Sequence, residues 1–442
     1  MRNKKSVSVI GLGKLGTPLA VTFASFGFKV IGVDTNKERI ELLNLNKTCL
    51  YESGLDEILN KYKNNLILTT DFKKAILNSR ITFIVVPTPS YKMGDFSLKH
   101  IFNALNQMAE TLKEKNQWHL VVITSTVSPY SMEKKIKPYL EKISGKKIGK
   151  NIGLCYSPEL IALGSVIKNL THPDFILIGE SDKKSGDILS KIRKSICKNN
   201  PPIIRTNFIN AEIIKIALNS YITTKISFAN MIARVCEKTL GADTDVVTST
   251  LGLDSRIGPK YLTGALGFGG PCFPRDNLAF NQFIKSLSLN IKLPYIVHQF
   301  NQDQIKSLIE IIFKYADRET IVGILGLSYK PNTNVIDESQ GVKLAEKLAD
   351  KGFKVIAYDP VVMDNAKLFL GNKIKFACSM LDCLKQSDII VITTPLPEFK
   401  NIKISALQRQ GNPRVVIDCW RILKYQGEEN VKYIALGRYI DQ

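Results

Sequence analysis

The sequence has no long apolar segment. Its longest apolar runs are Ile81–Val86, Leu120–Ile123 and Ile389–Ile392, and each is far shorter than the roughly 20 residues that cross a bilayer. The first residues, MRNKKSVSVIGLG, are basic but are interrupted by Gly11 and Gly13, so we expect no secretory signal peptide. The sequence therefore predicts a cytoplasmic protein without a membrane partner.

Paired cysteine motifs are also missing. The chain has eight cysteines, at positions 49, 155, 197, 236, 272, 378, 383 and 419. None of them belongs to a CxxC pair or to a quartet with the spacing of zinc ligands, and we predict no metal site. In a chain without a signal peptide, most of these cysteines are expected to be buried thiols. A functional cysteine must then be identified by its neighbours.

Acidic residues are outnumbered by basic ones, 40 to 61, which gives a formal charge of +21. The excess is spread along the chain, in pieces such as Lys73-Lys74, Lys134-Lys135 and Lys146-Lys147. No basic helix with interleaved aromatic residues and no zinc-finger spacing is present, so we predict no nucleic-acid partner. The charge indicates a lysine-rich surface that would attract a substrate carrying a pyrophosphate.

Strands and helices alternate along the chain, which predicts an α/β protein with parallel sheets. A length of 442 residues requires two or three domains. In the first half we expect a helix over residues 17–26. The strands expected there are Ser6–Ile10, Lys29–Val33, Ile81–Val86, Leu120–Thr124 and Ile152–Tyr156.

The last third of the chain repeats the order of the first. Four short strand motifs pair in sequence: VIGLG with ILGLS, IGVDT with IAYDP, IVVPTP with IVITTP, and VVITST with VVIDCW. The strands expected in this part are Ile321–Leu325, Lys354–Tyr358, Ile389–Thr393 and Val415–Asp418. The weak repeat indicates two doubly wound, Rossmann-like domains.

A helix over Asn210–Glu237, which contains neither proline nor glycine, is predicted between the two halves. It could form an inter-domain spine or a dimer surface. It could equally be a single buried core helix.

Gly11, Gly13 and Gly16 form a GxGxxG pattern that follows a strand and begins a helix, and Asp34 ends the next strand. The first glycine permits the tight turn, the second allows a pyrophosphate to approach the backbone, and the third allows close helix–strand packing. The helix N-terminus attracts the phosphate charge. Asp34 can bind ribose hydroxyls and would repel a 2′-phosphate, so the pattern predicts NAD rather than NADP.

Cys272 differs from the other cysteines because it lies in a glycine-rich segment, DSRIGPKYLTGALGFGGPCFPRD, over residues 254–276. Such a segment is neither ordinary helix nor ordinary strand, and loops on rigid scaffolds often carry reactive groups. A thiol beside cationic groups is more readily ionised. From the residues alone, Cys272 is either a nucleophile or a buried structural thiol.

The segment GFGGPCFPRD resembles the GFGGSCFPKD signature of the UDP-glucose/GDP-mannose dehydrogenase family. Three further segments resemble motifs of that family in the same order: CYSPELIALGS (155–165), AEIIKIALNSYITTKISFAN (211–230) and GLSYKPNTNVIDES (326–339). The resemblance covers essentially the whole chain. It implies an NAD-binding domain over 1–205, a central helical domain with catalytic residues and a dimer surface over 206–305, and a UDP-sugar-binding domain over 306–442.

This resemblance implies an NAD-dependent, four-electron oxidation of a nucleotide sugar at C6. Cys272 would attack the aldehyde formed by a first hydride transfer, and the thioester formed by a second would be hydrolysed. Lys215 and Asn219, one helical turn apart, would stabilise oxyanion charge. Asp276 would act with Lys215 on a water molecule, and Glu159 would accept a proton or position water.

Further residues are predicted to bind cofactor and substrate, although each could be an ordinary structural or surface residue. Thr126 matches a threonine near the reacting centre, and Arg256 matches an arginine that reaches into the neighbouring subunit's site, which implies a homodimer. The cofactor-binding residues are predicted to be Gly11, Gly13, Lys14, Leu15, Gly16, Asp34, Arg39, Pro87, Thr88 and Thr126. The substrate-binding residues are predicted to be Glu159, Lys215, Asn219, Arg256, Tyr261, Gly269 and Lys330.

Several positions depart from the family pattern: Leu163 replaces a glutamate, Pro271 a serine, Arg275 a lysine and Asp337 an arginine, and Asn334-Val335 an acidic pair. CFPRD favours UDP-glucose as the substrate and UDP-glucuronate as the product, for polysaccharide biosynthesis. A UDP-N-acetylhexosamine is the alternative substrate, and GDP-mannose is the third. The rival functions are a single-step β-hydroxyacid dehydrogenase and a basic binding protein on a dehydrogenase scaffold.

Overall fold

The computed structural model describes residues 6–48, 50–91, 94–409, 411, 413–425, 427 and 429–440. Cys49 lies outside the described residues. The chain divides into two compact units, Met1–Ala217 and Leu218–Gln442. Within the described ranges, no helix is both long and apolar enough to cross a membrane.

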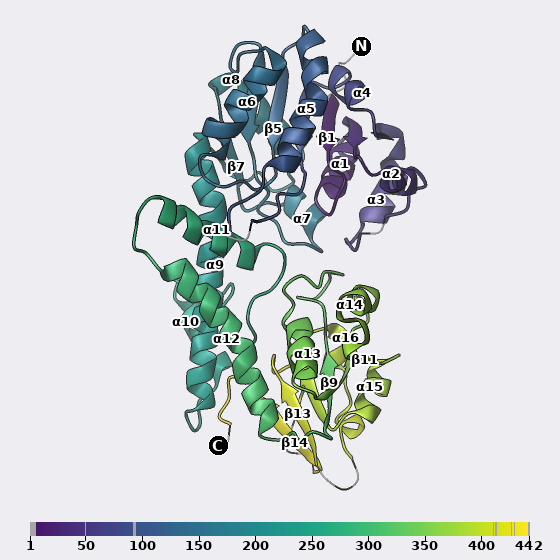
Figure 1. Cartoon of the computed structure of the whole chain (residues 1–442), viewed down its shortest axis with the longest axis vertical. Helices are drawn as coiled ribbons and strands as arrows, with labels where there is room; N and C mark the ends of the chain where they lie inside the picture. Colours follow the sequence, from purple (N-terminus) through teal and green to yellow (C-terminus); the bar gives the residue numbers. More distant parts are fainter. Residues whose placement is uncertain are drawn as a thin grey trace. The chain divides into compact units, whose positions relative to one another are not determined.

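The first unit contains an eight-stranded sheet with the order β3-β2-β1-β4-β5-β6-β7-β8 (Figure 1). All neighbouring strands are parallel except β6 and β7, which are antiparallel. The strands are β1 (Ser6–Ile10), β2 (Lys29–Val33), β3 (Leu66–Thr69), β4 (Ile81–Ile84), β5 (His119–Ile123), β6 (Ile152–Tyr156), β7 (Ile176–Glu180) and β8 (Ile203–Thr206).

Helices cover both faces of this sheet, so its central strands are buried on both sides. In β5, for example, Leu120 and Val122 pack on one face whereas Val121 and Ile123 pack on the other. One face is covered by α1 (Gly16–Ser25), α3 (Leu55–Tyr62), α7 (Val166–Thr171) and α8 (Lys183–Lys194). The other is covered by α4 (Phe72–Leu77), α5 (Lys99–Glu114), the π-helical turn η2 (Met132–Ile136) and α6 (Lys137–Ser144). The remaining elements are α2 (Lys37–Asn44) and η1 (Lys63–Asn65).

The second unit contains a six-stranded parallel sheet with the order β11-β10-β9-β12-β13-β14. Its strands are β9 (Ile321–Leu325), β10 (Lys354–Tyr358), β11 (Lys375–Phe376), β12 (Ile389–Ile392), β13 (Arg414–Asp418) and β14 (Val431–Ala435). One face packs on α12 (Leu293–Phe313), α13 (Gln340–Asp350) and α14 (Met363–Leu370), and the other on α15 (Met380–Gln386) and α16 (Pro397–Lys400). Two short turns complete it, η3 (Gly371–Lys373) and η4 (Ile404–Ala406).

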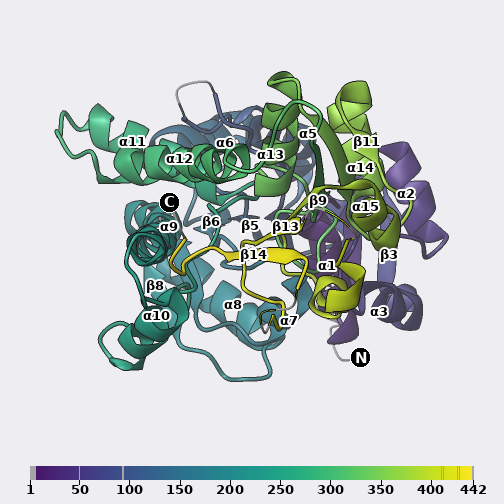
Figure 2. The same ribbon diagram turned by 90° about the horizontal axis from the view of Figure 1, so that it is seen from below.

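A helical segment connects the two sheets. It begins with α9 (Phe208–Glu237), followed by α10 (Thr244–Leu253) and α11 (Phe273–Ser286). The division between the units falls inside α9. In the second unit α11 packs against α12 (Figures 1 and 2), and the C-terminal end of α9 is tied to the end of the chain by a 2.9 Å bond from Gly437 N to Glu237 Oε1.

The predicted fold class is confirmed: the chain is an α/β protein with two parallel Rossmann-like sheets joined by a helical segment. The predicted long helix is present and begins two residues earlier, at Phe208. Strand β4 ends at Ile84 rather than Val86. Pro87 follows closely and, having no N–H group, cannot extend the ladder.

Candidate functional site

The glycine turn after β1 has the shape that the sequence predicts. Gly11 has a φ of 92°, and a Cβ there would lie 2.3 Å from Val85 O. A Cβ at Gly16 would lie 1.7 Å from Gly11 O, so only glycine lets α1 approach the turn this closely. At Gly13, by contrast, nothing lies within 4 Å of the Cβ position. The space beside Gly13, at the N-terminus of α1, is therefore open, as the approach of a pyrophosphate would require.

Asp34 holds this turn in place. Its Oδ2 accepts hydrogen bonds from Leu12 N at 2.8 Å and from Arg39 Nη1 at 2.9 Å, and its Oδ1 accepts one from Asn36 N at 2.9 Å. The carboxylate is nearly buried, but it lies at the wall of an open pocket. A carboxylate at the end of β2 has the position expected for binding a ribose.

This pocket has a volume of about 620 Å³. Four of the predicted cofactor-binding residues line it: Gly11, Asp34, Arg39 and Pro87. The other six, Gly13, Lys14, Leu15, Gly16, Thr88 and Thr126, do not. The sequence prediction missed further lining residues, among them Phe72, His100, Asn103 and Gln107.

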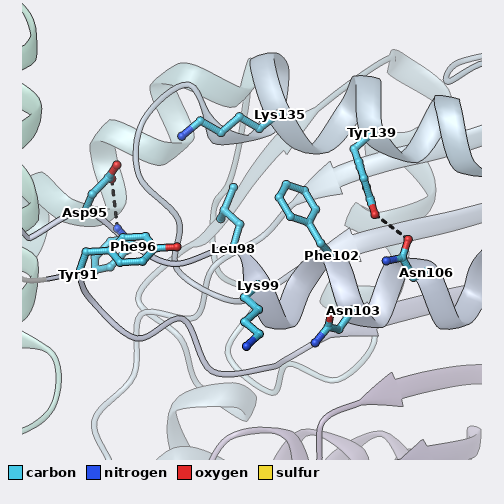
Figure 3. Close-up of a pocket in the computed structure, with 10 residues that line it drawn as sticks. All are labelled: Tyr91, Asp95, Phe96, Leu98, Lys99, Phe102, Asn103, Asn106, Lys135 and Tyr139. Carbon is cyan, nitrogen blue, oxygen red and sulfur yellow. Dashed lines mark hydrogen bonds between the residues drawn. The ribbon is translucent and has the colours of Figure 1, made fainter.

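A second pocket of about 560 Å³ lies on the neighbouring side of α5 (Figure 3). The two pockets share Asn103 and Asn106 of α5. In the second pocket Asn106 Oδ1 accepts a 2.7 Å bond from the hydroxyl of Tyr139, whose ring is 4.5 Å from that of Phe102 (Figure 3). None of the predicted site residues lies in this second pocket.

In the first unit, one predicted cofactor-binding residue and two predicted catalytic residues follow neighbouring strands. Thr88 follows β4, Thr126 follows β5 and Glu159 follows β6. The hydroxyl of Thr88 donates to Thr126 O at 2.8 Å. Because β4, β5 and β6 are parallel neighbours, their carboxyl ends lie at one edge of the sheet, which is where open α/β sheets bind ligands.

Lys215 of α9 is anchored to Glu159. Its Nζ donates a 3.0 Å hydrogen bond to the main-chain carbonyl of Glu159. Lys215 is 7% exposed, so it is not the solvated surface lysine that the sequence left as an alternative.

The carboxylate of Glu159 is bound to Arg193 of α8, a residue that the sequence prediction missed. Arg193 Nη2 donates to Glu159 Oε2 at 2.9 Å, and Nη1 donates to Oε1, which makes a two-pronged ion pair. Both side chains are almost completely buried, at 4% and 6% exposure. A charge-assisted pair with this geometry fixes both partners.

In the second unit, side-chain amides hold the glycine-rich loop that leads to Cys272. Asn230 of α9 donates to Leu266 O at 3.0 Å and accepts from Ala265 N at 2.8 Å. Asn301 of α12 makes the equivalent pair of bonds to the backbone of Phe268, at 2.9 and 2.7 Å. These amides satisfy the backbone of a segment that has no ladder of its own.

Cys272 lies at the N-terminus of α11, where it is exposed. The N-terminus of a helix stabilises negative charge and favours the thiolate. The ring of Tyr329 packs on Gly270, where a Cβ would lie 2.6 Å from the ring. Burial raises the pKa of Tyr329, and the nearby Cys272 and Asp337 raise it further, so its phenol stays neutral. The sequence prediction missed Tyr329.

Two predicted catalytic residues meet beside this helix. Asp276, in the first turn of α11, is fully buried, and its Oδ2 accepts a 2.6 Å hydrogen bond from Asn219 Nδ2. Its Oδ1 accepts from Arg275 Nε at 3.2 Å. Asp276 N donates to Cys272 O at 2.8 Å, which links the carboxylate to the thiol through one helical turn.

The predicted substrate-binding residues of the second unit lie in different surroundings. Arg256 has an 86% exposed side chain that pairs with Asp254 at 2.6 Å. Tyr261 is partly exposed and has a φ of 66°. A Cβ at Gly269 would lie 2.5 Å from Glu338 O, and Lys330 Nζ is 5.7 Å from the Tyr329 ring.

Two of the positions that depart from the family pattern have structural roles. Leu163 packs against the apolar core of the first unit, and Asp337 O accepts a 2.9 Å bond from Gly270 N. No group of three or more His, Cys, Asp or Glu side chains suited to a metal ion occurs in the part of the chain that the structure describes.

Three models of the UDP-glucose/GDP-mannose dehydrogenase family match the chain. The NAD binding domain matches residues 5–197, the central domain residues 209–303 and the UDP binding domain residues 323–425. The first of these descriptions supports NAD as the cofactor.

Similar proteins span almost the entire chain. UDP-glucose 6-dehydrogenase AglM of Haloferax volcanii is 33% identical over 94% of this chain and 97% of its own. The structure of a UDP-glucose dehydrogenase from Pyrobaculum islandicum has a TM-score of 0.91 at 31% identity and covers 99% of both chains. That of a UDP-D-ManNAc dehydrogenase from Pyrococcus horikoshii has a TM-score of 0.86 at 25% identity and covers 98% of this chain and 99% of its own.

Proposed function

The chain belongs to the UDP-glucose/GDP-mannose dehydrogenase family, and on that premise we propose that it oxidises UDP-glucose to UDP-glucuronate with NAD⁺. One observation supports the proposal beyond family membership: Cys272 is the N-cap of α11, and the buried Asp276 in the first turn of that helix is bonded to Asn219 of α9. A nucleophile with a positioned carboxylate nearby suits covalent oxidation and hydrolysis.

The reaction removes four electrons from C6. NAD⁺ supplies the acceptor for each of the two hydrides. The alcohol first becomes an aldehyde, and the Cys272 thiolate adds to its carbonyl carbon to form a thiohemiacetal. Loss of the second hydride leaves a thioester, and water cleaves the carbon–sulfur bond to give the carboxylate and restore the thiol. A single-step dehydrogenase would not need Cys272.

The chain's own residues would stabilise charge and bind the reactants. Lys215 and Asn219 lie one turn apart on α9 and would stabilise oxyanion charge. Asp276 and Glu159 would position the hydrolytic water, and Thr126 would lie close to the reacting carbon. Cofactor binding would use Gly11, Gly13, Lys14, Leu15, Gly16, Asp34, Arg39, Pro87, Thr88 and Thr126. Substrate binding would use Arg256, Tyr261, Gly269 and Lys330 together with Glu159, Lys215 and Asn219.

We also propose the division into three domains, 1–205, 206–305 and 306–442, and a homodimer. The family models, which match three successive segments, support this division. Exposed apolar side chains on one end of α9 and on α10 support the dimer: Tyr221, Phe228, Met231, Val235, Val246 and Leu253. An exposed Arg256 is available to a second subunit.

We propose that the enzyme works in the cytoplasm and supplies uronate for polysaccharide synthesis. Unbridged cysteines suit a reducing compartment, and six carry no disulfide: Cys155, Cys197, Cys236, Cys378, Cys383 and Cys419.

Counting NADH per sugar tests the proposed reaction. UDP-glucose, UDP-GlcNAc, UDP-ManNAc and GDP-mannose are each supplied in limiting amounts to the wild type and to Cys272→Ser. We expect two NADH per UDP-glucose from the wild type, with loss or stalling in the variant. One NADH per sugar, or full activity of Cys272→Ser, would contradict the thioester route. Two NADH from a UDP-N-acetylhexosamine alone would establish the alternative substrate.

A further inference from the structure

We propose that Arg193 is a positioning residue for Lys215. It acts through Glu159, whose side-chain carboxylate binds Arg193 and whose main-chain carbonyl binds Lys215. This inference rests on the proposed function, because it concerns the lysine expected to stabilise oxyanion charge. All three residues belong to the first unit. Nothing in the sequence motifs marks Arg193, which lies in the lysine-rich stretch of α8.

The first step is the ion pair. The two terminal nitrogens of the Arg193 guanidinium each bind one oxygen of the Glu159 carboxylate. The guanidinium fork is planar and rigid, so this arrangement fixes the direction of the carboxylate as well as its distance. Because both side chains are almost fully buried, water cannot replace either partner.

The second step leads from Glu159 to Lys215. While Arg193 holds the side chain of Glu159, the main-chain carbonyl of Glu159 accepts the 3.0 Å bond from Lys215 Nζ. One of the three ammonium protons is thereby committed to a fixed carbonyl. The remaining two keep a defined direction and can serve an oxyanion without reorganisation.

Removing Arg193 alone would disturb this arrangement in a specific way. The Glu159 carboxylate would stay buried without its counter-ion, which costs several kcal/mol of free energy. Lys215 carries the ammonium group that is already bonded to the main chain of the same residue. The carboxylate would draw Lys215 away from the carbonyl. Removing both charges together would leave no such competitor.

The experiment compares Arg193→Met, Arg193→Lys and the double variant Arg193→Met/Glu159→Met. We expect Arg193→Met to lower kcat roughly ten- to hundredfold, the range for a group that orients a catalytic residue. The KM values for NAD⁺ and UDP-glucose should stay within about twofold, because uniform binding is not affected. Arg193→Lys should retain more activity than Arg193→Met. Because Glu159 is itself proposed to position the hydrolytic water, the double variant is compared with Arg193→Met by the labelling of Lys215, which should return toward the wild-type rate.

A matched control is available in the same unit. Arg205 binds Glu180 at 2.7 Å in a partly exposed ion pair, so Arg205→Met makes the same substitution away from Lys215. We expect this control to keep wild-type kcat. An Arg193→Met enzyme with wild-type kcat would overturn the proposal.

A second measurement does not depend on turnover. Lys215 is labelled with an amine-reactive reagent and quantified by mass spectrometry relative to the exposed Lys168. Labelling of Lys215 should be several-fold slower in Arg193→Met than in the wild type or in Arg205→Met, because an ion pair with the buried Glu159 carboxylate keeps the amine protonated. Unchanged labelling would overturn the positioning role. If the wild type reduced no NAD⁺ with any nucleotide sugar, the proposed function would fail, and the labelling would still decide the role of Arg193.

Discussion

Asn219 donates a 2.6 Å hydrogen bond to Asp276, whose carboxylate is completely buried in the first turn of α11. The same aspartate is bonded through its main-chain N–H to the carbonyl of Cys272. A movement of Asp276 would therefore change the position of the Cys272 backbone, and with it that of the thiol. This pair links α9 to the helix that follows the proposed nucleophile.

Replacing Asp276 by asparagine tests that link. Asp276→Asn removes the negative charge that can accept a proton from water, so we expect kcat with UDP-glucose to fall about 10²- to 10⁴-fold. The KM for NAD⁺ should be nearly unchanged, because neither Asp276 nor its bonded partners Asn219 and Arg275 line the proposed NAD pocket. Steady-state kinetics check both values. Asp303→Asn, at a partly exposed site on α12, is the control and should keep full activity. Equal activity of the two variants would remove Asp276 from the mechanism.

Much of the fold could be predicted from the sequence because buried parallel strands are short apolar runs that end at glycine, aspartate or proline. Strands β1, β2, β6, β9 and β10 have the predicted bounds. The edge strands β3 and β8 were missed, since LILT and IIRT are only partly buried. Strand β7 was missed because it pairs antiparallel to β6, outside the repeating βα pattern.

The residues of the candidate site could be predicted only where they belong to a recognisable sequence motif. Cys272, Asp276 and the glycine turn stand in recognisable segments. Arg193 does not, because its burial depends on a partner 34 positions away, and an arginine among lysines looks like a surface residue. The same holds for Asn230 and Asn301, whose amides bind backbone that is distant in sequence.

The two glycines of the nucleotide turn should fail in different ways when changed to alanine. In Gly16→Ala the methyl group would overlap Gly11 O, so the fold should lose about 1–3 kcal/mol of stability and the Tm should fall. In Gly13→Ala the methyl group enters open space, so the Tm should hold. The KM for NAD⁺ should rise about ten- to hundredfold, because that is the effect of losing one hydrogen bond to a charged group such as the pyrophosphate. Thermal melts and NAD⁺ titrations separate the two effects, and identical behaviour of both variants would contradict this account.

Cys272 should react with iodoacetamide before the other described cysteines. Burial raises the pKa values of Cys155 and Cys419 well above normal. Cys378 is the matched control, because it is exposed too but has the carboxylate of Asp382 bonded to its N–H. The N-terminus of α11 should make Cys272 about two- to fivefold more reactive than Cys378. Timed alkylation at neutral pH with peptide mass spectrometry measures the ratio, and faster labelling of Cys378 would contradict the thiolate assignment.

Glu212 should make the stability of the first unit depend on pH. Burial raises the pKa of this carboxyl from 4.5 to about 7, against the opposing effect of hydrogen bonds from Met132 N and Tyr130 N. A carboxyl whose pKa is higher in the folded state binds more protons there between pH 4.5 and 7. Its contribution is therefore complete below pH 4.5 and is lost as the pH rises through about 7, with a magnitude of roughly 3 kcal/mol.

Glu212→Gln removes this titration but keeps a neutral acceptor for one of the two N–H groups. The variant should be less stable than the wild type at pH 5, where wild-type Glu212 is largely protonated, and the difference in Tm should shrink by pH 8. His119 does not confound the comparison: burial, together with the nearby Lys115, lowers its pKa to about 3, and the imidazole is present in both proteins. Glu133→Gln, in the neighbouring η2 turn and exposed beside Lys137, controls for removing a charge there. A Tm difference that stays constant from pH 5 to 8 would show that Glu212 remains ionised throughout, held by its two N–H donors.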